Sequence, residues 1–330
     1  MEELLIIGRL VRMSVFSTEE VIPAGVDWAK VFADAGTNGV SAICYDAVKR
    51  LPAELQPDFD LMLRWDISAQ GLREGFRYRH EAMCELRDLL KANGMDMLLL
   101  KGETLADNYP QPELRESGDV DFVSLPDYGA CNALIESMGI SLDSHEEKHS
   151  GFVFKGVHFE NHTLEPTGGY NRVHGRTFAL LRESLPDAVR RADGCLELEP
   201  VTQAVFVVKH TAQHLCYSGG RIALRMLLDL ALLLRRYPEI LEKWEPELIQ
   251  TGLDRIAPVI LCATDILLGT TFCNDCGKRI ERRAGLFIRL FLTDSNRALR
   301  YFAKFLFLPL RPAEVLRILR NRLTGVAATS

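Results

Sequence analysis

The chain has 330 residues, of which 47% are hydrophobic and 25% are charged, and its mean hydropathy is close to zero. This composition excludes an intrinsically disordered chain, a collagen, a coiled coil and a disulfide-rich miniprotein. The formal net charge of −6 carries no overall basic signature of a dedicated nucleic-acid-binding protein, and the length predicts two or three packed subdomains.

Basic residues are concentrated near the C-terminus, where residues 278–330 hold twelve Lys or Arg against three acidic residues. Such a face attracts an acidic substrate or RNA, although a solvated helix face is the simpler interpretation. Cys273 and Cys276 form one CxxC without a second ligand pair after it, which favours reduced structural cysteines over a zinc site. With no secretory signal and no apolar stretch of spanning length, we expect a cytoplasmic protein without a membrane span.

The first 93 residues have the apolar spacing of helices. Asp27 is a suitable N-cap for a first helix and Gly36 a suitable stop. A second helix is predicted over residues 41–51, and a long amphipathic helix over the stretch that ends near Ala92, where Asn93 and Gly94 form a C-terminal cap.

The pattern changes at residue 95. Residues 95–100 form a short apolar run, Lys101 and Gly102 open a predicted helix over 103–109, and residues 118–123 alternate like a half-buried strand. A helix near 127–138 and a strand region over 152–164 complete an α+β segment, after which helical periodicity persists from residue 200 to the end. We therefore predict three parts: an N-terminal helical region (1–93), an α+β domain (94–198) and a C-terminal helical domain (199–330).

Asp119 and Asp121 are the sharpest chemical signal. Side chains two residues apart in a strand point to the same face, so these carboxylates project together about 6 to 7 Å apart at the backbone. Two unpaired carboxylates repel each other, and a bound divalent cation usually offsets that repulsion. Two surface acids at the end of a strand would have the same pattern. On the later strand region, even positions place His158, Glu160 and His162 on one face, so Glu160 meets the aspartates if these strands pair.

A family resemblance strengthens this pattern. Residues 98–110 (Leu-Leu-Leu-Lys-Gly-Glu-Thr-Leu-Ala-Asp-Asn-Tyr-Pro), Arg115 and residues 118–121 (Gly-Asp-Val-Asp) resemble the signature of uncharacterised nucleotidyltransferases in the DNA polymerase beta superfamily. Residues 157–162 resemble the family's third-carboxylate strand, and the downstream helix with His210, His214, Arg225 and Asp229 is similar to its helical domain.

The resemblance implies a nucleotidyltransferase-like mixed sheet and an enzyme that moves a nucleoside monophosphate from an NTP to a hydroxyl of an unknown acceptor. It implies Asp119, Asp121 and Glu160 as ligands of Mg²⁺ or Mn²⁺. Nucleotide contacts are expected from Lys101, Gly102, Arg115 and Gly118, and supporting roles from His158, His162, His210, His214, Arg225 and Asp229. The acceptor is a small molecule, a protein or an RNA. One departure stands out, because many superfamily members have Gly-Ser or Gly-Gly where this chain has Lys101-Gly102-Glu103.

Several of these residues also have ordinary structural interpretations. Arg115 equally suits a phosphate contact and a loop arginine facing solvent. His210 and His214 share a helix face and suit neutral, packed histidines better than a metal pair, since the glutamate of an HExxH pattern is missing. Arg225 and Asp229 are one turn apart, so a structural ion pair is the default.

Three alternatives remain open at this level. One is an AMP-transferring enzyme of toxin or defence type, which falls within the same reaction class. A second is a degenerate nucleotidyltransferase that binds nucleotide or a partner without turnover. The third is a glycosyltransferase with a DxD metal motif, which requires a nucleotide-binding α/β domain before Asp119.

Overall fold

A computed structural model describes residues 1–142, 144–145, 149–165, 172–217, 221–273, 277–293, 300 and 307. Residues 274–276, and with them Cys276 of the CxxC pair, lie outside the described residues, as does most of the basic segment after residue 293.

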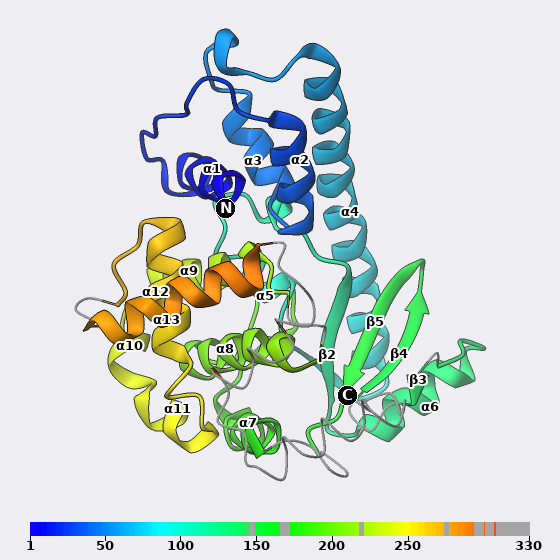
Figure 1. Ribbon diagram of the computed structural model, residues 1–330. Coiled ribbons are helices and arrows are strands. Elements are labelled where there is room, and N and C mark those ends of the chain that lie inside the picture. Colours follow the sequence, from blue (N-terminus) through cyan, green and yellow to red (C-terminus); the bar gives the residue numbers. More distant parts are fainter. Residues whose placement is uncertain are drawn as a thin grey trace, which may run out of the picture.

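The chain forms helices first, then a sheet with interspersed helices, then helices again (Figure 1). The helices are α1 Glu2–Val11, α2 Trp28–Thr37, α3 Ser41–Val48, α4 Phe59–Ala92, α5 Glu103–Ala106, α6 Tyr128–Ser137, α7 Arg172–Glu183, α8 Pro200–Tyr217, α9 Leu224–Arg236, α10 Ile240–Lys243, α11 Glu245–Thr251, α12 Ala257–Leu268 and α13 Gly277–Phe287. The strands are β1 Asp96–Leu99, β2 Asp119–Leu125, β3 Ser144–His145, β4 His149–Phe154, β5 Val157–His162, β6 Val189–Arg190 and β7 Leu196–Glu197.

The strands form one mixed sheet in the order β3-β4-β5-β2-β1-β7-β6, which confirms the predicted α+β class. At its centre β2 pairs in parallel with β5 and antiparallel with β1. The parallel register sets Asp121 opposite Glu160 and Asp119 opposite His158. Because both acids lie on central strands, the sheet itself holds them in place.

The two faces of the sheet are covered by different helices. On one face Val120, Phe122 and Phe159 pack in a core with Phe152 and with side chains of α4 and α6. On the other face, which carries the acids, Val123 packs in a core with residues of α7 and α8. Phe159 is fully buried, so its truncation to Ala is expected to cost about 3–5 kcal/mol.

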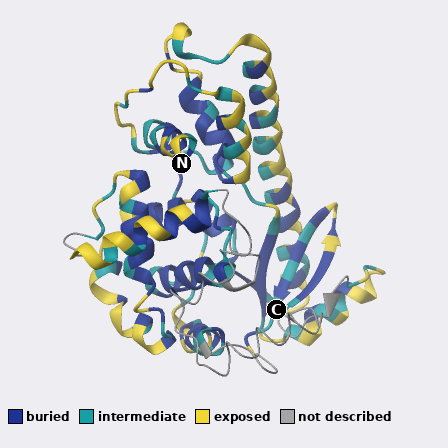
Figure 2. Cartoon of the chain, in the orientation of Figure 1, coloured by how far each residue is buried: buried dark blue, intermediate teal, exposed yellow. Residues whose placement is uncertain are grey.

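The remaining helices share one large core. Buried residues of α1, α2 and α3 belong to the same cluster as those of α8, α9, α12 and α13, and α1 packs directly against α12. In Figure 2 buried residues of these helices lie toward the middle of the helical part, and exposed residues lie along its outer side. The N-terminal helices therefore close onto the C-terminal ones, while the domain boundaries at 93 and 198 stay a prediction.

The predicted caps of the N-terminal helices are mostly confirmed. Asp27 caps α2 by accepting a hydrogen bond from the backbone N–H of Lys30 at 3.0 Å. The predicted stop at Gly36 is wrong, since α2 continues to Thr37. The cap at Asn93 is confirmed, and Gly94 follows it with a φ of +75°.

The strand region predicted over 152–164 is a hairpin rather than one strand. β4 and β5 pair antiparallel around a two-residue turn of Lys155 and Gly156, whose φ angles are +48° and +72°. Positive φ at both central residues is typical of the turn that matches strand twist in hairpins.

Across the described part of the chain, none of the helices combines the length and the hydropathy needed to cross a membrane.

Candidate active site

Three carboxylates meet on the face of the sheet that is turned toward α7 and α8. Asp119 and Asp121 stand on β2, and Glu160 stands beside them on β5. Each carboxylate has an oxygen that could bind a metal ion, and these three oxygens all lie within 4.8 Å of one another. Asp121 is only 1% exposed, whereas Asp119 and Glu160 are partly exposed. The register therefore brings together the three acids that the sequence singled out.

Two basic side chains contact the most buried acid. Lys101 Nζ lies 2.9 Å from Asp121 Oδ2, and His162 Nε2 lies 3.0 Å from Asp121 Oδ1. Burial raises the pKa of Asp121, but Lys101 and His162 outweigh it and hold that pKa well below its ordinary value. Burial likewise lowers the pKa of Lys101, and the carboxylates of Asp121 and Asp119 raise it by more.

His162 also bridges to the third acid. The same Nε2 atom is 3.4 Å from Glu160 Oε2. Burial lowers the pKa of His162, yet its hydrogen bonds to Asp121 and Glu160 outweigh burial and raise that pKa above its ordinary value. The pKa of Glu160 is lowered overall, because His162 more than offsets the effect of burial. His162 thus contacts two of the acids directly.

Gly102 forms the turn between β1 and α5 with φ +77° and ψ −105°. Residues that carry a side chain rarely adopt this backbone conformation, so the turn requires glycine. A Cβ here would also meet Ser117 Oγ at 3.7 Å and the Asp119 carbonyl oxygen at 3.8 Å. Gly118 differs, since a Cβ there would meet no atom within 4 Å and its φ is not positive.

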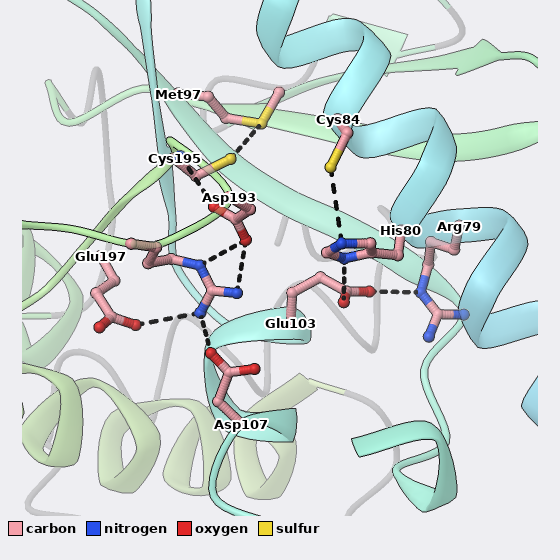
Figure 3. Close-up of polar contacts among 10 residues, drawn as sticks. Arg79, His80, Cys84, Met97, Glu103, Asp107, Asp193, Cys195 and Glu197 are labelled. Atoms are coloured by element: carbon pink, nitrogen blue, oxygen red, sulfur yellow. Dashed lines mark hydrogen bonds and ion pairs between the residues drawn. The ribbon is translucent and has the colours of Figure 1, made fainter. Parts of the chain in front are cut away.

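Glu103, the last residue of the Lys101-Gly102-Glu103 sequence, is buried, and Figure 3 shows its side chain directed at Arg79 and His80. Its carboxylate accepts a hydrogen bond from Arg79 Nε at 3.3 Å and lies 3.3 Å from His80 Nδ1, both on α4. Arg79 Nη1 also donates to the Ser117 carbonyl oxygen at 2.9 Å. Glu103 therefore connects the glycine turn to α4, and through Arg79 to the loop before β2. These contacts explain why a glutamate follows Gly102.

A pocket lies between this turn and the helices α8 and α9. Its wall includes Lys101, Gly102 and Asp119 on the sheet side, and residues of the two helices on the other. The lining holds three Lys or Arg side chains and two carboxylates, Asp119 and Asp229. The full lining is Lys101, Gly102, Leu105, Arg115, Ser117, Asp119, Phe206, Val207, His210, Thr211, Arg225, Met226 and Asp229.

Arg115 lines this pocket but is held by an acid. Its Nε and Nη2 atoms donate to the two oxygens of Asp229 at 2.8 and 2.9 Å, and Tyr109 Oη donates to Asp229 Oδ1 at 2.7 Å. The interpretation of Arg115 as a solvent-facing loop residue is wrong, since it is 4% exposed. Its Nη1 is buried and has no hydrogen-bond partner within the described chain.

Arg225 does not form the ion pair predicted from its spacing to Asp229. Asp229 instead pairs with Arg115, and Arg225 Nη1 donates to the Glu116 carbonyl oxygen at 2.5 Å. Burial together with the nearby Arg115 lowers the pKa of Arg225. The prediction failed because spacing on one helix does not reveal a competing partner from a distant loop.

His210 and His214 lie one turn apart on α8 in an edge-to-face arrangement, with ring centroids 4.7 Å apart and an angle of 77° between the rings, and His210 lines the pocket. Burial, with a contribution from Lys101, lowers the pKa of His210 well below its ordinary value and the pKa of His214 to about 4. Both are therefore neutral near pH 7. Among the described residues, neither belongs to a group with metal-ligand spacing.

His149 is the site residue that the sequence did not single out. It lies on β4 directly opposite His162, and its Nε2 is 3.8 Å from Glu160 Oε1. The signal that would have found it is the Lys155-Gly156 turn, because a two-residue turn there makes 149 and 162 cross-strand partners. His158, on the same face of β5, lies opposite Asp119 and outside both groups with metal-ligand spacing.

Comparison of the sequence with known protein families gives a match. Residues 24–269, well over half of the chain, match the model of a family described as uncharacterised nucleotidyltransferase. No curated protein and no solved structure matches the chain. The matched segment runs from α2 through α12 and contains the three carboxylates, the glycine turn and the pocket. The chain therefore belongs to this family of uncharacterised nucleotidyltransferases.

Proposed function

We propose that the protein transfers a nucleoside monophosphate from an NTP to a hydroxyl group of an acceptor. The observation that carries this proposal is the meeting of three carboxylates on one sheet face beside a glycine turn and a cationic pocket. In this reaction the acceptor hydroxyl releases its proton to water, its oxygen bonds to the α-phosphorus, the bond from that phosphorus to the bridging oxygen breaks, and pyrophosphate leaves.

The acid group suits a hard divalent cation. Its donors are carboxylate oxygens, which Mg²⁺ and Mn²⁺ prefer, and the three side chains can each turn one oxygen toward a common point. We propose that Asp119, Asp121 and Glu160 hold Mg²⁺ or Mn²⁺. When bound, such an ion supplies Lewis-acid stabilisation of the charge that develops at the attacking and leaving oxygens.

The chain's own cations would bind the triphosphate. Lys101 and Arg225 bring positive charge to the pocket wall, and the Gly102 turn lets the backbone approach a phosphate closely because no side chain intervenes. Arg115, although paired with Asp229, retains the Nη1 donor that has no partner in the described chain. These groups favour bound phosphates electrostatically and leave the carboxylates to hold the metal ion.

The helical N-terminus argues against the glycosyltransferase alternative. A nucleotide-sugar enzyme of the DxD type needs a nucleotide-binding α/β domain before the acid pair. Residues 1–95 are all described and contain helices α1 to α4 but no strand. The acid pair here stands on the second strand of the chain.

The test is a binding titration of the protein with ATP, GTP, CTP and UTP, each with Mg²⁺ or Mn²⁺, followed by thermal unfolding. An NTP at 100 times its Kd is expected to stabilise the fold by about 2.7 kcal/mol. Asp119→Asn is expected to lose the metal-dependent part of this shift. Asp60→Asn, which makes the same charge change at an exposed position of α4, is the control and keeps the shift.

Transfer itself is then followed with α-labelled NTP offered to pools of small molecules, proteins and RNA. Label in one pool that depends on metal and on Asp119 supports the proposal and identifies the acceptor class. Stabilisation by an NTP without label in any pool would favour a nucleotide-binding protein without turnover. No stabilisation by any of the four NTPs contradicts the proposal.

A further inference from the structure

A second group with metal-ligand spacing borders the three carboxylates. His149 and His162 are direct cross-strand partners in the β4–β5 hairpin, on the same face as Glu160. Their ring centroids are 5.1 Å apart with the rings tilted by 42°. The Nε2 atoms approach different oxygens of the same carboxylate: His149 lies 3.8 Å from Glu160 Oε1 and His162 lies 3.4 Å from Glu160 Oε2.

These separations match the edge of a small tetrahedron. Zn²⁺ binds imidazole nitrogen and carboxylate oxygen at about 2.0–2.2 Å in tetrahedral geometry, which places neighbouring ligand atoms about 3.4 Å apart. The distance from Glu160 to His162 equals this value, and that to His149 exceeds it by only a few tenths of an ångström. The two distances run to different oxygens of Glu160, and the three ligand atoms lie within 4.8 Å of one another. Side-chain rotation therefore has to bring one oxygen and both nitrogens to this spacing before a single ion can bind all three.

The donor atoms also select the kind of metal. Mg²⁺ prefers oxygen ligands in octahedral geometry, whereas imidazole nitrogen favours Zn²⁺ and its neighbours in the first transition row. We propose that His149, Glu160 and His162 form a Zn²⁺ site with three protein ligands and a fourth position open to water or substrate. Three protein ligands with one open position are the arrangement of zinc sites that take part in chemistry rather than in folding alone.

This site shares one ligand with the carboxylate group but does not depend on nucleotide transfer. Glu160 belongs to both groups, so Zn²⁺ and a Mg²⁺ ion held by Asp119 and Asp121 would either share its two oxygens or compete for them. His162 uses the same Nε2 atom to bond Asp121, so Zn²⁺ binding breaks that hydrogen bond. The site therefore links the availability of Zn²⁺ to the charge balance around Asp121.

The test uses Co²⁺, whose visible absorption is strong when its ligands are tetrahedral, on the metal-free protein without any nucleotide. We expect one Co²⁺ per chain at this site, displaced by Zn²⁺ and not by Mg²⁺. His149→Ala is expected to weaken binding at least about 100-fold, since even the loss of a residue behind a ligand costs about 10- to 100-fold. His149→Cys keeps a zinc-binding atom and should retain the site.

Two controls separate this site from its neighbours. Asp119→Asn should leave the Co²⁺ spectrum unchanged, because Asp119 is not among the three ligands. The titration is repeated in a Cys273→Ser background, which removes a contribution from the CxxC pair. Unchanged affinity in His149→Ala, or equal loss in Asp119→Asn, overturns the proposal, as does a failure to bind Zn²⁺. None of these results depends on NTP binding, so this inference and the proposed function can fail separately.

Discussion

The ion pair between Lys101 and Asp121 is expected to be among the strongest electrostatic contacts in the protein. The side chain of Asp121 is 2% exposed and that of Lys101 is 21% exposed, so water screens their attraction poorly. We consider Lys101→Met and Asp121→Asn, which remove one charge each and keep the side-chain size close to that of the original.

The distance sets the scale of the effect. At an effective dielectric constant of about 20, opposite unit charges 2.9 Å apart attract by about 6 kcal/mol. Desolvation of both groups offsets much of this. Lys101→Met is expected to cost about 3–5 kcal/mol because it leaves the buried Asp121 carboxylate without its lysine, and Asp121→Asn is expected to cost less because the lysine that remains is 21% exposed. The double variant leaves neither charge and should lose less than the sum, with a coupling energy of about 2–3 kcal/mol.

Urea unfolding of the wild type, both single variants and the double variant measures this coupling. A pair at nearly the same distance serves as the control: Arg190 and Asp96 lie 3.0 Å apart, but their side chains are 48% and 41% exposed. Solvent screening should leave that pair without measurable coupling. If Lys101 and Asp121 prove additive, or no more coupled than the exposed pair, the reasoning from burial is refuted.

Three further changes test other parts of the site. Arg115→Met should destabilise the fold by about 3–5 kcal/mol in urea unfolding, because it strands the buried carboxylate that the arginine binds at two oxygens; a loss below 1 kcal/mol would show that this acid finds another partner. Gly102→Ala should cost about 1–3 kcal/mol through its strained backbone and weaken NTP binding, whereas Gly118→Ala should behave like wild type, and equal effects would contradict the geometry. The hydrogen bond to Glu103 raises the pKa of His80, so its stabilising contribution is present below about pH 6.5 and is lost as pH rises through the raised value. His80→Gln should remove this loss of stability above about pH 6.5, measured by urea unfolding at a series of pH values.

Local patterns predicted the acidic face because its geometry is local. Alternation located β2 and put both aspartates on one face, and the same period of two put Glu160 on the matching face of β5. Pairing between the two strands was then the only long-range assumption, and the register confirms it by setting Asp121 opposite Glu160. The predicted strand region over 152–164 missed the hairpin because it ignored the turn at Lys155 and Gly156.

The charge partners could not be predicted because they come from far along the chain. Asp229 pairs with Arg115, 114 residues away, rather than with the arginine one turn before it. Glu103 finds its partners on α4, where Arg79 and His80 precede it by more than 20 residues. Sequence spacing identifies which side chains share a face of one element, but only packing decides which element that face meets.

The same packing decides which substitution can test the proposed chemistry without also changing the stability of the fold. Removing an acid that has no cationic partner should relieve its repulsion with a neighbouring acid. That reasoning holds for Asp119, which forms no ion pair with any described residue. It fails for Asp121, since that buried carboxylate contacts Lys101 and His162, and both partners would lose this contact in the partly exposed positions they occupy. A loss of activity in Asp121→Asn would therefore confound chemistry with stability. Asp119→Asn removes a proposed metal ligand while leaving this buried charge cluster complete, so its loss of activity can be attributed to the site's chemistry.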